Sequence, residues 1–586
     1  MYNEIWKVLR NKKDIDLISK EYKISPFMAK IITNRNVLDE KQIKNYIDCD
    51  YKNLNDPYDM KDMKKSVDIL MDKINEKKKI RIIGDYDVDG VMSVYILYTA
   101  LKKCEANVDF EIPDRIKDGY GINKNIIELA KNDGVDTIIT CDNGISAIEE
   151  VDFAKELGIT IIITDHHDVK IDKDTKREIL PKADGILNPK QSDCNYKFDK
   201  ICGAGVVFKL MECIYEKYNI SKEETYKLIE FVGIATICDV VDLIDENRVF
   251  VRKSLEMINN TTNLGLLELI KANELDEKEI VGYHYGFVIG PCINASGRLE
   301  SAKKGLNMLL SETKEEASCF ANELVAINEE RKEMTFKGLD RAIEIIESTN
   351  LKDDRVLVVY IENIHESLAG IIAGRVKEKY NKPTIIITES EDGIKGSARS
   401  IEEYNVFEGL LDCEHFLTRF GGHPMAAGLS LKPENLDLLR RTLNENCNLT
   451  DEDLSKKINI DVVAYTNLIN FGILDELKKL EPFGKGNEKP IFGMQDVEIL
   501  GIKILGKNQN FMKIRLLKDG VQMEGTMFDK VSYFENKIIN KYGESALNSL
   551  YGAQNNRGIS ISFSFYPRLN SFNGNNTLQL EISNIK

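Results

Sequence analysis

Short runs of β-branched and aliphatic residues alternate with longer helix-forming stretches in the first part of the chain. The clearest runs are KIRIIG (79–84), VDTIIT (135–140) and ITIIIT (159–164). Strands that are apolar at nearly every position are typical of a parallel sheet covered on both faces. The intervening stretches predicted as helices include 91–102, 125–131 and 148–157. This βα alternation predicts an α/β domain with a parallel sheet.

The remaining pattern changes character several times along the chain. A stretch of helix formers at 311–348, interrupted only by Gly338, predicts a long connecting helix. A second βα segment follows, with strands at 356–360 and 384–388, and the last part has short strands separated by Gly and Asn turns. The predicted order is a helical segment (1–50), a parallel-sheet domain (51–310), the connecting helix (311–348), a second α/β domain (349–450) and a small β-barrel (455–586).

Length and composition narrow the class of protein. A chain of 586 residues exceeds one core, so three to five domains of roughly 100–200 residues are expected. Its eleven cysteines are odd in number and form no C-x-x-C pair, which favours neither a disulfide framework nor a zinc site. No apolar run approaches the ~20 residues of a membrane span, and the first residues lack a signal-peptide layout. We expect a cytoplasmic protein.

The formal net charge of −16 argues against a protein that coats nucleic acid by bulk attraction. This net charge is compatible with a local basic channel that binds nucleic acid. Carboxylates gathered to hold metal ions also make a chain more acidic than the groove that binds its substrate.

Acids follow each of the three apolar runs, and the third is also followed by two histidines. GDYDVDG (84–90) follows the first, CDNG (141–144) the second and DHH (165–167) the third, while Asp239 ends the run GIATIC (233–238). A single Asp after a strand is usually a turn or cap residue. Several aspartates that follow neighbouring parallel strands lie together at the ligand-binding edge of the sheet. Their carboxylates repel one another there unless a cation neutralises them.

Carboxylate oxygens with one imidazole suit Mn²⁺ or Mg²⁺ better than a thiolate-preferring ion. A carboxylate that bridges two such ions, about 3.5–4 Å apart, gives the two-metal arrangement of phosphoryl chemistry. The sequence therefore predicts a two-metal site for phosphate esters.

In this order the four segments resemble the motifs of the DHH phosphoesterase superfamily. The resemblance implies that Asp87 and Asp89 divide between two divalent cations, Mn²⁺ or Mg²⁺. It also implies that Asp142 and Asp239 are shared or bridging ligands and that His166 is a ligand. Asp85 and His167 would support the ligands or face the phosphate. The predicted catalytic residues are Asp85, Asp87, Asp89, Asp142, His166, His167 and Asp239.

Further segments resemble the RecJ branch of that superfamily. They are IPDR (112–115) with GYG (119–121), GPCINASGRL (290–299), HE (365–366), GSARS (396–400), GGHPMAAG (421–428) and EPFGKGN (481–487). The resemblance implies a DHHA1 substrate domain, a C-terminal OB-fold and a 5′-to-3′ exonuclease that hydrolyses single-stranded DNA to 5′ mononucleotides in repair and recombination. Candidate protein partners are a single-strand-binding protein and a helicase. Cys292 departs from the family, which usually has Arg there.

The predicted substrate-binding residues are Arg115, Tyr120, Arg298, Ser397, Arg399, Gly421, Gly422 and His423. Two successive glycines let backbone amides approach a phosphate, and Ser397 and Arg399 supply charge-assisted hydrogen bonds. Each also has a plain alternative: the glycines could form a tight turn, His423 could be a core histidine and Arg298 a surface ion-pair partner.

The predicted barrel contains cations close to an aromatic residue. Lys503, Lys507, Lys513, Arg515 and Lys518 surround Phe511 in the sequence. Single-strand binding uses this combination of backbone attraction and base stacking, and a solvated lysine face is the alternative.

Two other functions share parts of the pattern. A DHH/DHHA1 phosphodiesterase for short oligonucleotides or cyclic dinucleotides has the metal motifs but is usually shorter and lacks the barrel. A catalytically inactive scaffold that resembles Cdc45 has lost metal ligands, whereas this chain has all those expected.

Overall fold

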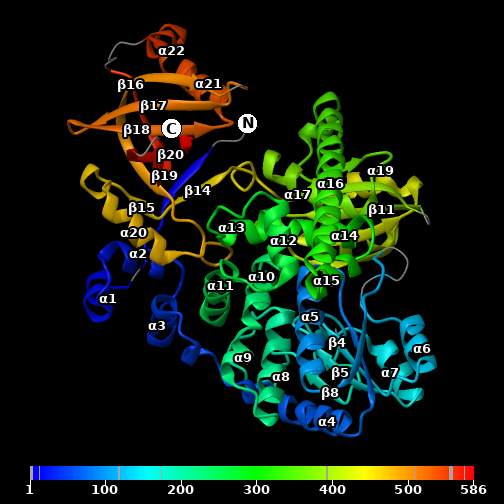
Figure 1. Cartoon of the computed structure of the whole chain (residues 1–586). Helices are drawn as coiled ribbons and strands as arrows, with labels where there is room; N and C mark the ends of the chain where they lie inside the picture. Colours follow the sequence, from blue (N-terminus) through cyan, green and yellow to red (C-terminus); the bar gives the residue numbers. More distant parts are fainter. Residues whose placement is uncertain are drawn as a thin grey trace. The chain divides into compact units, whose positions relative to one another are not determined.

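The computed structural model (Figure 1) describes residues 4–11, 13–115, 119, 121–172, 174–390, 393–506, 508–552, 558–572 and 575–586. The chain forms two compact units. Unit 1 comprises Leu54–Val241 and Val249–Lys456, and unit 2 comprises Glu4–Asn53, Asp242–Arg248 and Lys457–Lys586. Among the helices described, none combines the length and the apolar character needed to cross a membrane.

The first sheet of unit 1 has five parallel strands in the order β3-β2-β4-β5-β8. Its central strands are the three predicted ones, β2 (Lys79–Ile83), β4 (Thr137–Cys141) and β5 (Thr160–Thr164). The edge strands β3 (Asn107–Glu111) and β8 (Gly185–Leu187) were not predicted. Because β2, β4 and β5 are neighbours, the segments that follow them emerge side by side at one edge of the sheet.

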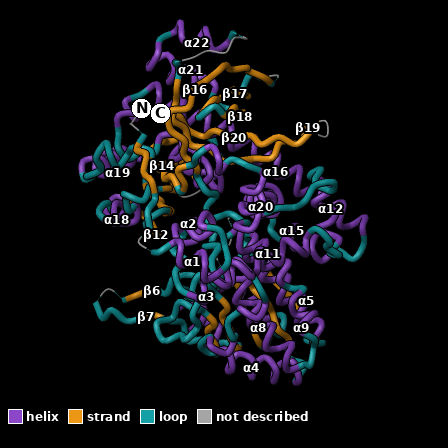
Figure 2. The backbone as a smooth tube through the Cα atoms, turned by 90° about the vertical axis from the view of Figure 1, so that its left-hand side faces the viewer, coloured by secondary structure: helices purple, strands orange, loops and turns teal. Residues whose placement is uncertain are grey.

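Helices cover both faces of this sheet, as the continuous apolar strands require. One face carries α5 (Val88–Lys103) and α8 (Gly203–Lys217), and α10 (Ile229–Cys238) packs on these two helices. The other carries α6 (Lys124–Asn132) and α7 (Ile148–Glu156), whose apolar side chains share a core with β4 and β5. A short hairpin, β6 (Lys170–Ile171) with β7 (Glu178–Ile179), follows the DHH segment and projects from the unit (Figure 2).

The second sheet of unit 1 has the order β12-β13-β11-β10-β9. The strands β9 (Leu357–Tyr360) and β10 (Thr384–Ser390) run parallel, and β11 (Gly393–Arg399), β13 (Ala426–Leu431) and β12 (Leu417–His423) continue antiparallel. The predicted long helix is confirmed as α16 (Lys314–Ser348). Its single glycine, Gly338, lies where α17 (Ala369–Tyr380) crosses, since a Cβ there would lie 2.5 Å from Ile372 Cδ1.

Unit 2 contains a closed barrel, as predicted. Its strands are β16 (Phe492–Leu505), β17 (Phe511–Lys518), β18 (Val521–Phe528), β20 (Asn575–Ile585) and β19 (Ser560–Phe572). Pairing of β16 with β19 closes the ring. Two helices that were not predicted, α21 (Val531–Tyr542) and α22 (Glu544–Tyr551), lie between β18 and β19 in the chain.

The N-terminal segment packs on this barrel and is not helical throughout. It begins with β1 (Ile5–Val8), which pairs in parallel with β14 (Lys457–Ile460). The helices α1 (Ile15–Tyr22), α2 (Pro26–Asn34) and α3 (Glu40–Asp48) contribute buried residues to the same apolar core as the barrel strands. Residues from the two ends of the described chain are therefore buried in the same core of unit 2.

Candidate metal centre

The loop that joins β2 to α5 and the first turn of α5 carry three aspartates around a tight turn. A Cβ at Gly90 would lie 2.4 Å from the Asp85 carbonyl oxygen, so only glycine lets the chain fold back here. Asp87 caps α5 by accepting a hydrogen bond from the Gly90 amide at 3.1 Å. The loop thereby turns Asp85 and Asp87 toward Asp142, and one oxygen of each lies within 4.8 Å of the others.

The N-terminus of α8 holds the third aspartate, Asp89, which lies in the first turn of α5. The amides of Gly203 and Ala204 donate to the two carboxylate oxygens of Asp89, at 2.6 and 2.7 Å. These unsatisfied helix amides and the positive end of the helix dipole stabilise a negative charge. A Cβ at Gly203 would also lie 2.8 Å from Asp142 Cβ. Gly203 therefore permits the close approach of Asp89 and Asp142.

Asp165, the first residue of the DHH segment, orients the histidines that follow it. Its Oδ1 accepts from the amides of His166 and His167 at 2.7 and 3.1 Å, and from His167 Nδ1 at 2.7 Å. Burial disfavours both charged forms, but the attraction between them outweighs it. The pKa of His167 is raised to about 9 and that of Asp165 is lowered to about 2. Asp165 is a functional residue that was not among the predicted catalytic residues.

His166 lies among the carboxylates. Its Nε2 is 3.1 Å from Asp142 Oδ1, 3.5 Å from Asp239 Oδ2 and 3.7 Å from Asp89 Oδ2. Burial and the charge of His167 lower the pKa of His166 to about 3, so the imidazole is neutral near pH 7. A neutral imidazole that faces carboxylates at these distances has the form of a metal ligand.

Burial raises the pKa of the convergent carboxyl groups, and their mutual repulsion raises it further. The effect holds for Asp85, Asp142 and Asp239, whose pKa values lie well above the usual range, and for Asp89, whose pKa is raised to about 7. Such a cluster needs positive charge to remain ionised.

The donor atoms fit divalent cations. Among the residues described, the buried atoms Asp85 Oδ1, His166 Nε2 and Asp239 Oδ2 have no hydrogen-bond partner, although buried polar atoms are normally satisfied. Three overlapping ligand groups occur: Asp85, Asp87 and Asp142; Asp89, His166 and Asp239; and Asp142, His166 and His167. Oxygen-rich groups with one neutral imidazole suit Mn²⁺ or Mg²⁺.

Helix α14 (Gly290–Leu299) supports the metal loop from behind. Asn294 Oδ1 accepts from the Val88 amide at 3.1 Å, and a Cβ at Gly297 would lie 2.2 Å from the Tyr86 carbonyl oxygen. Cys292 is buried in the same helix, with Asn328 Nδ2 3.4 Å from its sulfur.

Guanidinium groups gather next to the metal ligands. Burial and the neighbouring positive charges of Arg115, Arg331 and Arg399 lower the pKa of Arg298 to about 10, against the opposing effect of Asp87. Arg298 donates to the Ser367 carbonyl oxygen at 3.0 Å, so it is not a surface ion-pair partner. Several half-buried cations close to one another favour an anionic ligand.

The second sheet aligns small residues next to these cations. Gly428 of β13 pairs with Ser397 of β11 on one side and with Gly421 of β12 on the other. In a neighbouring row Ala426 pairs with Arg399 and with His423.

The structure also answers the alternatives left open for these residues. The two glycines lie in a strand and not in a tight turn. His423 is exposed, with Nδ1 3.6 Å from Asp168 Oδ2, so it is not a core histidine. Tyr120 lies outside the described residues.

Three family models match successive parts of the chain. The DHH family N-terminal domain matches residues 79–236, the DHHA1 domain 353–449 and the RecJ OB domain 460–584. The single-stranded-DNA-specific exonuclease RecJ of Bacillus subtilis is 35% identical over 552 residues, which are 93% of this chain and 68% of that protein. The chain belongs to the RecJ family. The RecJ of Haemophilus influenzae is 29% identical over 96% of each chain.

Solved RecJ structures have the same fold. The crystal structure of RecJ in complex with Mn²⁺ from Thermus thermophilus matches with a TM-score of 0.79 and 21% identity, covering 100% of this chain and 80% of that one. A second structure, exonuclease RecJ bound to manganese, matches with a TM-score of 0.57 and 26% identity, covering 67% of this chain and 98% of that one.

The barrel expected of a RecJ protein carries an aromatic surface. Phe511 and Phe528 stack with ring centroids 4.6 Å apart, and Phe528 is 46% exposed. Lys503 lies opposite Lys513, whose Nζ is 2.9 Å from Glu524, and Lys507 is outside the described residues. The lysine cluster is therefore partly engaged by acids, while the stacked rings remain available to a ligand.

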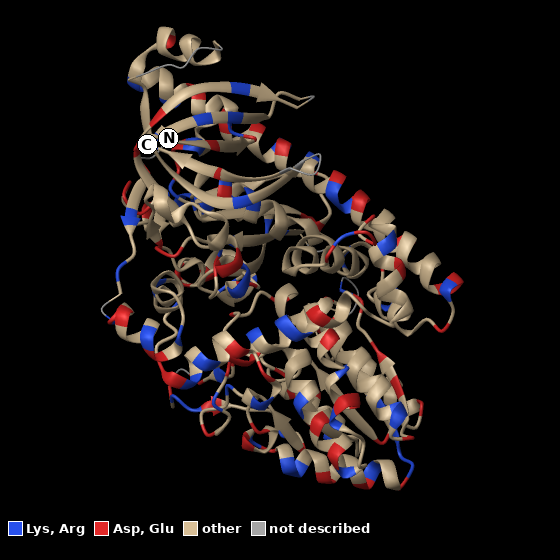
Figure 3. Ribbon diagram, turned by 60° about the vertical axis from the view of Figure 1, so that its left-hand side comes forward, with Lys and Arg blue, Asp and Glu red and all other residues tan. Residues whose placement is uncertain are grey.

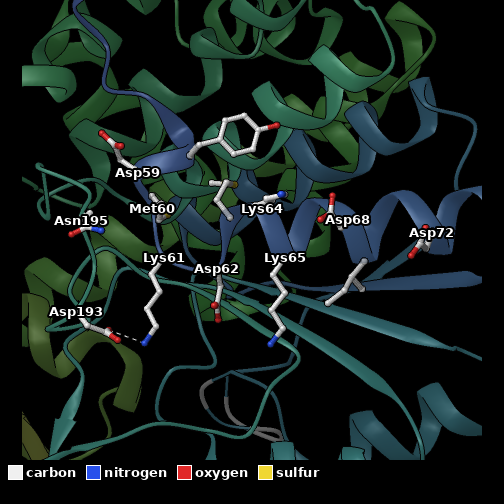
Figure 4. Close-up of a pocket in the computed structure, with 13 residues that line it drawn as sticks. Asp59, Met60, Lys61, Asp62, Lys64, Lys65, Asp68, Asp72, Asp193 and Asn195 are labelled. Atoms are coloured by element: carbon white, nitrogen blue, oxygen red, sulfur yellow. Dashed lines mark hydrogen bonds and ion pairs between the residues drawn. The ribbon is translucent and has the colours of Figure 1, made fainter.

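Positive and negative residues alternate along the helices (Figure 3). A hollow of about 660 Å³ beside the start of α4 (Met63–Asn75) is lined by both charges, with Lys61 Nζ 2.7 Å from Asp193 (Figure 4). None of the predicted site residues lines it.

We predict that Gly203→Ala weakens metal binding. The added methyl group would press on Asp142 and shift the amides that hold Asp89, and such supporting contacts are worth about 10–100-fold in metal affinity. Calorimetric titration with Mn²⁺ measures the change. Gly374→Ala is the matched control, because a Cβ at Gly374 meets no atom within 4 Å. Equal Mn²⁺ affinity of Gly203→Ala and the parent protein would contradict the assignment.

Asp142→Ala tests the centre itself. Asp142 belongs to two of the three ligand groups, so its loss should lower turnover by several orders of magnitude. DNA binding should be largely retained, because phosphate contacts elsewhere provide it. Turnover and DNA affinity are measured beside Asp152→Ala, a surface variant on α7. Retention of even a tenth of the parent rate would exclude Asp142 as a shared ligand.

Proposed function

We propose that this chain is a metal-dependent exonuclease that digests single-stranded DNA from its 5′ end and releases 5′ mononucleotides. The observation that carries the proposal is the convergence of aspartates and a neutral imidazole beside a cluster of half-buried guanidiniums. Its relatives are named single-stranded-DNA-specific exonucleases. DNA repair and recombination in the cytoplasm is the setting we propose, with a single-strand-binding protein and a helicase as partners. Pull-down with the purified partners tests the last point.

The cations and the side chains of the protein would each supply part of the chemistry. When bound, two divalent cations would supply a nucleophilic hydroxide and neutralise charge on the phosphate at the point of attack. Asp142, after β4, and His166, after β5, would hold the cations from the ends of these strands. Asp89 in α5 and Asp239 at the end of α10 would hold them from the helices. His167, kept positively charged by Asp165, would bind a non-bridging phosphate oxygen and orient the linkage.

The cluster of arginine side chains around Arg298 would recognise the 5′ end of the strand. We place a terminal 5′ phosphate against Arg115, Ser397 and Arg399, with the amides of Gly421 and Gly422 as further donors. A phosphate fixed beside the metal ligands sets the distance from the strand end to the linkage that is cut. The enzyme would therefore remove one nucleotide at a time.

Two features weigh against the other functions. The aromatic surface of the barrel has no role in an enzyme that cleaves only short oligonucleotides or cyclic dinucleotides. An inactive scaffold has no need of a metal-ligand cluster whose members repel one another when no cation is present.

Arg399→Ala should weaken the preference for a 5′-phosphorylated end more than it slows turnover at saturating substrate, because the lost contact lies on the end phosphate. The test compares 3′-labelled oligonucleotides with a 5′ phosphate or a 5′ hydroxyl. Arg341→Ala, which removes an exposed guanidinium paired with Glu344, is the control. Degradation that starts at the 3′ end would overturn the proposed direction.

Replacing both Phe511 and Phe528 with Ala should weaken binding of long single strands, since each stacked base contributes about 1–3 kcal/mol. Point variants are preferred to truncation near residue 454, because the barrel shares its core with α1–α3. Affinity is measured across a salt series beside Leu569→Ala, an exposed apolar residue of β19. Unchanged affinity of the double variant would remove the barrel surface from the proposal.

A further inference from the structure

Two aromatic side chains on the surface of unit 1 stack on each other without being covered. The rings of Tyr283 and Phe287 lie 4.8 Å apart at an angle of 17°, and His284 contacts the edge of Tyr283 at 5.9 Å. Tyr283 is 62% exposed and Phe287 67% exposed. Large aromatic side chains gain free energy when they leave water, so an exposed stacked pair is suited to a ligand with flat apolar faces.

This pair begins a continuous helical run that passes behind the metal centre. The run consists of α13 (Gly282–His284), a turn of π-helix, η3 (Tyr285–Ile289), and α14 (Gly290–Leu299). Single π-helical turns occur frequently at functional sites. The last turn of the run contains Arg298, which belongs to the cluster of arginine side chains next to the metal ligands.

Contacts with metal-ligand segments follow in order along the run. Near its start, the Tyr285 carbonyl oxygen accepts from Cys238 Sγ at 3.4 Å, next to the ligand Asp239. A Cβ at Gly290 would lie 2.3 Å from the same sulfur. Further along, Asn294 holds the Val88 amide beside Asp87.

The order sets a direction for the substrate. A helix rises 1.5 Å per residue, so the 11 to 15 residues from the aromatic pair to Arg298 span about 16–22 Å. The metal-ligand segments contact the run between these two ends. The proposed function puts the 5′ phosphate against Arg115 and Arg399, which neighbour Arg298. The strand beyond the cut linkage then extends toward the aromatic end.

Charge indicates which part of the strand would touch the aromatic pair. The loop that leads into α13 exposes Asp276, Glu277 and Glu279 around a single Lys278. Acidic groups repel phosphates but do not hinder stacking of neutral bases. The loop therefore favours contact through bases and disfavours contact through the sugar-phosphate backbone.

We propose that Tyr283 and Phe287 form a stacking platform for bases of the single strand on the 3′ side of the linkage that is cut. The inference rests on the proposed function and adds a subsite to it. The platform holds the strand in line with the metals during each cleavage, and it favours strands long enough to reach it over very short ones.

The test uses the full-length protein with both rings replaced by Ala, the substrates being a 5′-phosphorylated dinucleotide and a 5′-phosphorylated 12-mer. On the 12-mer we expect kcat/KM to fall about 10- to 100-fold, mainly through KM, since one or two stacked bases are lost. On the dinucleotide, which is too short to reach the pair, we expect no change. Tyr283→Phe should retain the parent behaviour, and Phe336→Ala, a 53% exposed aromatic residue of α16, is the control.

Two further measurements separate stacking from other roles. A 12-mer with abasic sites at the positions that reach the platform should reduce the parent protein to the level of the double variant, while the variant should lose nothing more. The slope of affinity against salt should stay the same in the variant, because no phosphate contact is removed.

Equal losses on the dinucleotide and the 12-mer would indicate a structural role and overturn the platform. So would unchanged kcat/KM on the 12-mer, which would assign the surface to a protein partner instead. Failure of the parent protein to digest any single strand would overturn the proposed function, and this outcome is visible before any variant is measured.

Discussion

Repulsion among buried carboxylates is the constraint on which the rest of unit 1 depends. Asp85 and Asp142 are buried and Asp239 is half-buried, and burial and mutual repulsion raise the pKa of all three carboxyl groups. The chain supplies part of the neutralising positive charge through the α8 amides on Asp89 and leaves the rest to cations. Tight glycine contacts, and the support given by α14, then fix side chains that would otherwise move apart.

The sequence predicted those parts of the fold and site that have a local signature. Strands β2, β4 and β5 are rich in isoleucine and buried at nearly every position, and an acid after each of them implied a shared edge once the strands were taken as parallel. Residues whose role comes from distant contacts had no such signature. Asp165 had no role assigned from the sequence, but in the structure it orients His167, and only folding brings Gly203 against Asp142.

Short or half-exposed elements were missed for a related reason. Strand β1 has four residues and becomes a strand only by pairing with β14, more than 400 residues away along the chain. The edge strand β3 alternates charged and apolar residues, so it lacked the continuous apolar pattern that identified its neighbours. The alignment of Ser397, Gly428 and Gly421 across three strands likewise depends on a register that no local pattern specifies.

The core shared by α1–α3 and the barrel has a consequence for synthesis of the protein. Residues 15–48 are synthesised more than 400 residues before the strands that complete their core. At about 5–20 residues per second the apolar faces of these helices wait on the order of half a minute to two minutes for their partners. During this interval unit 1 can fold while the N-terminal helices remain incomplete. The apolar faces of α1–α3 in the nascent chain therefore stay exposed to solvent or to other proteins until the barrel strands have been made.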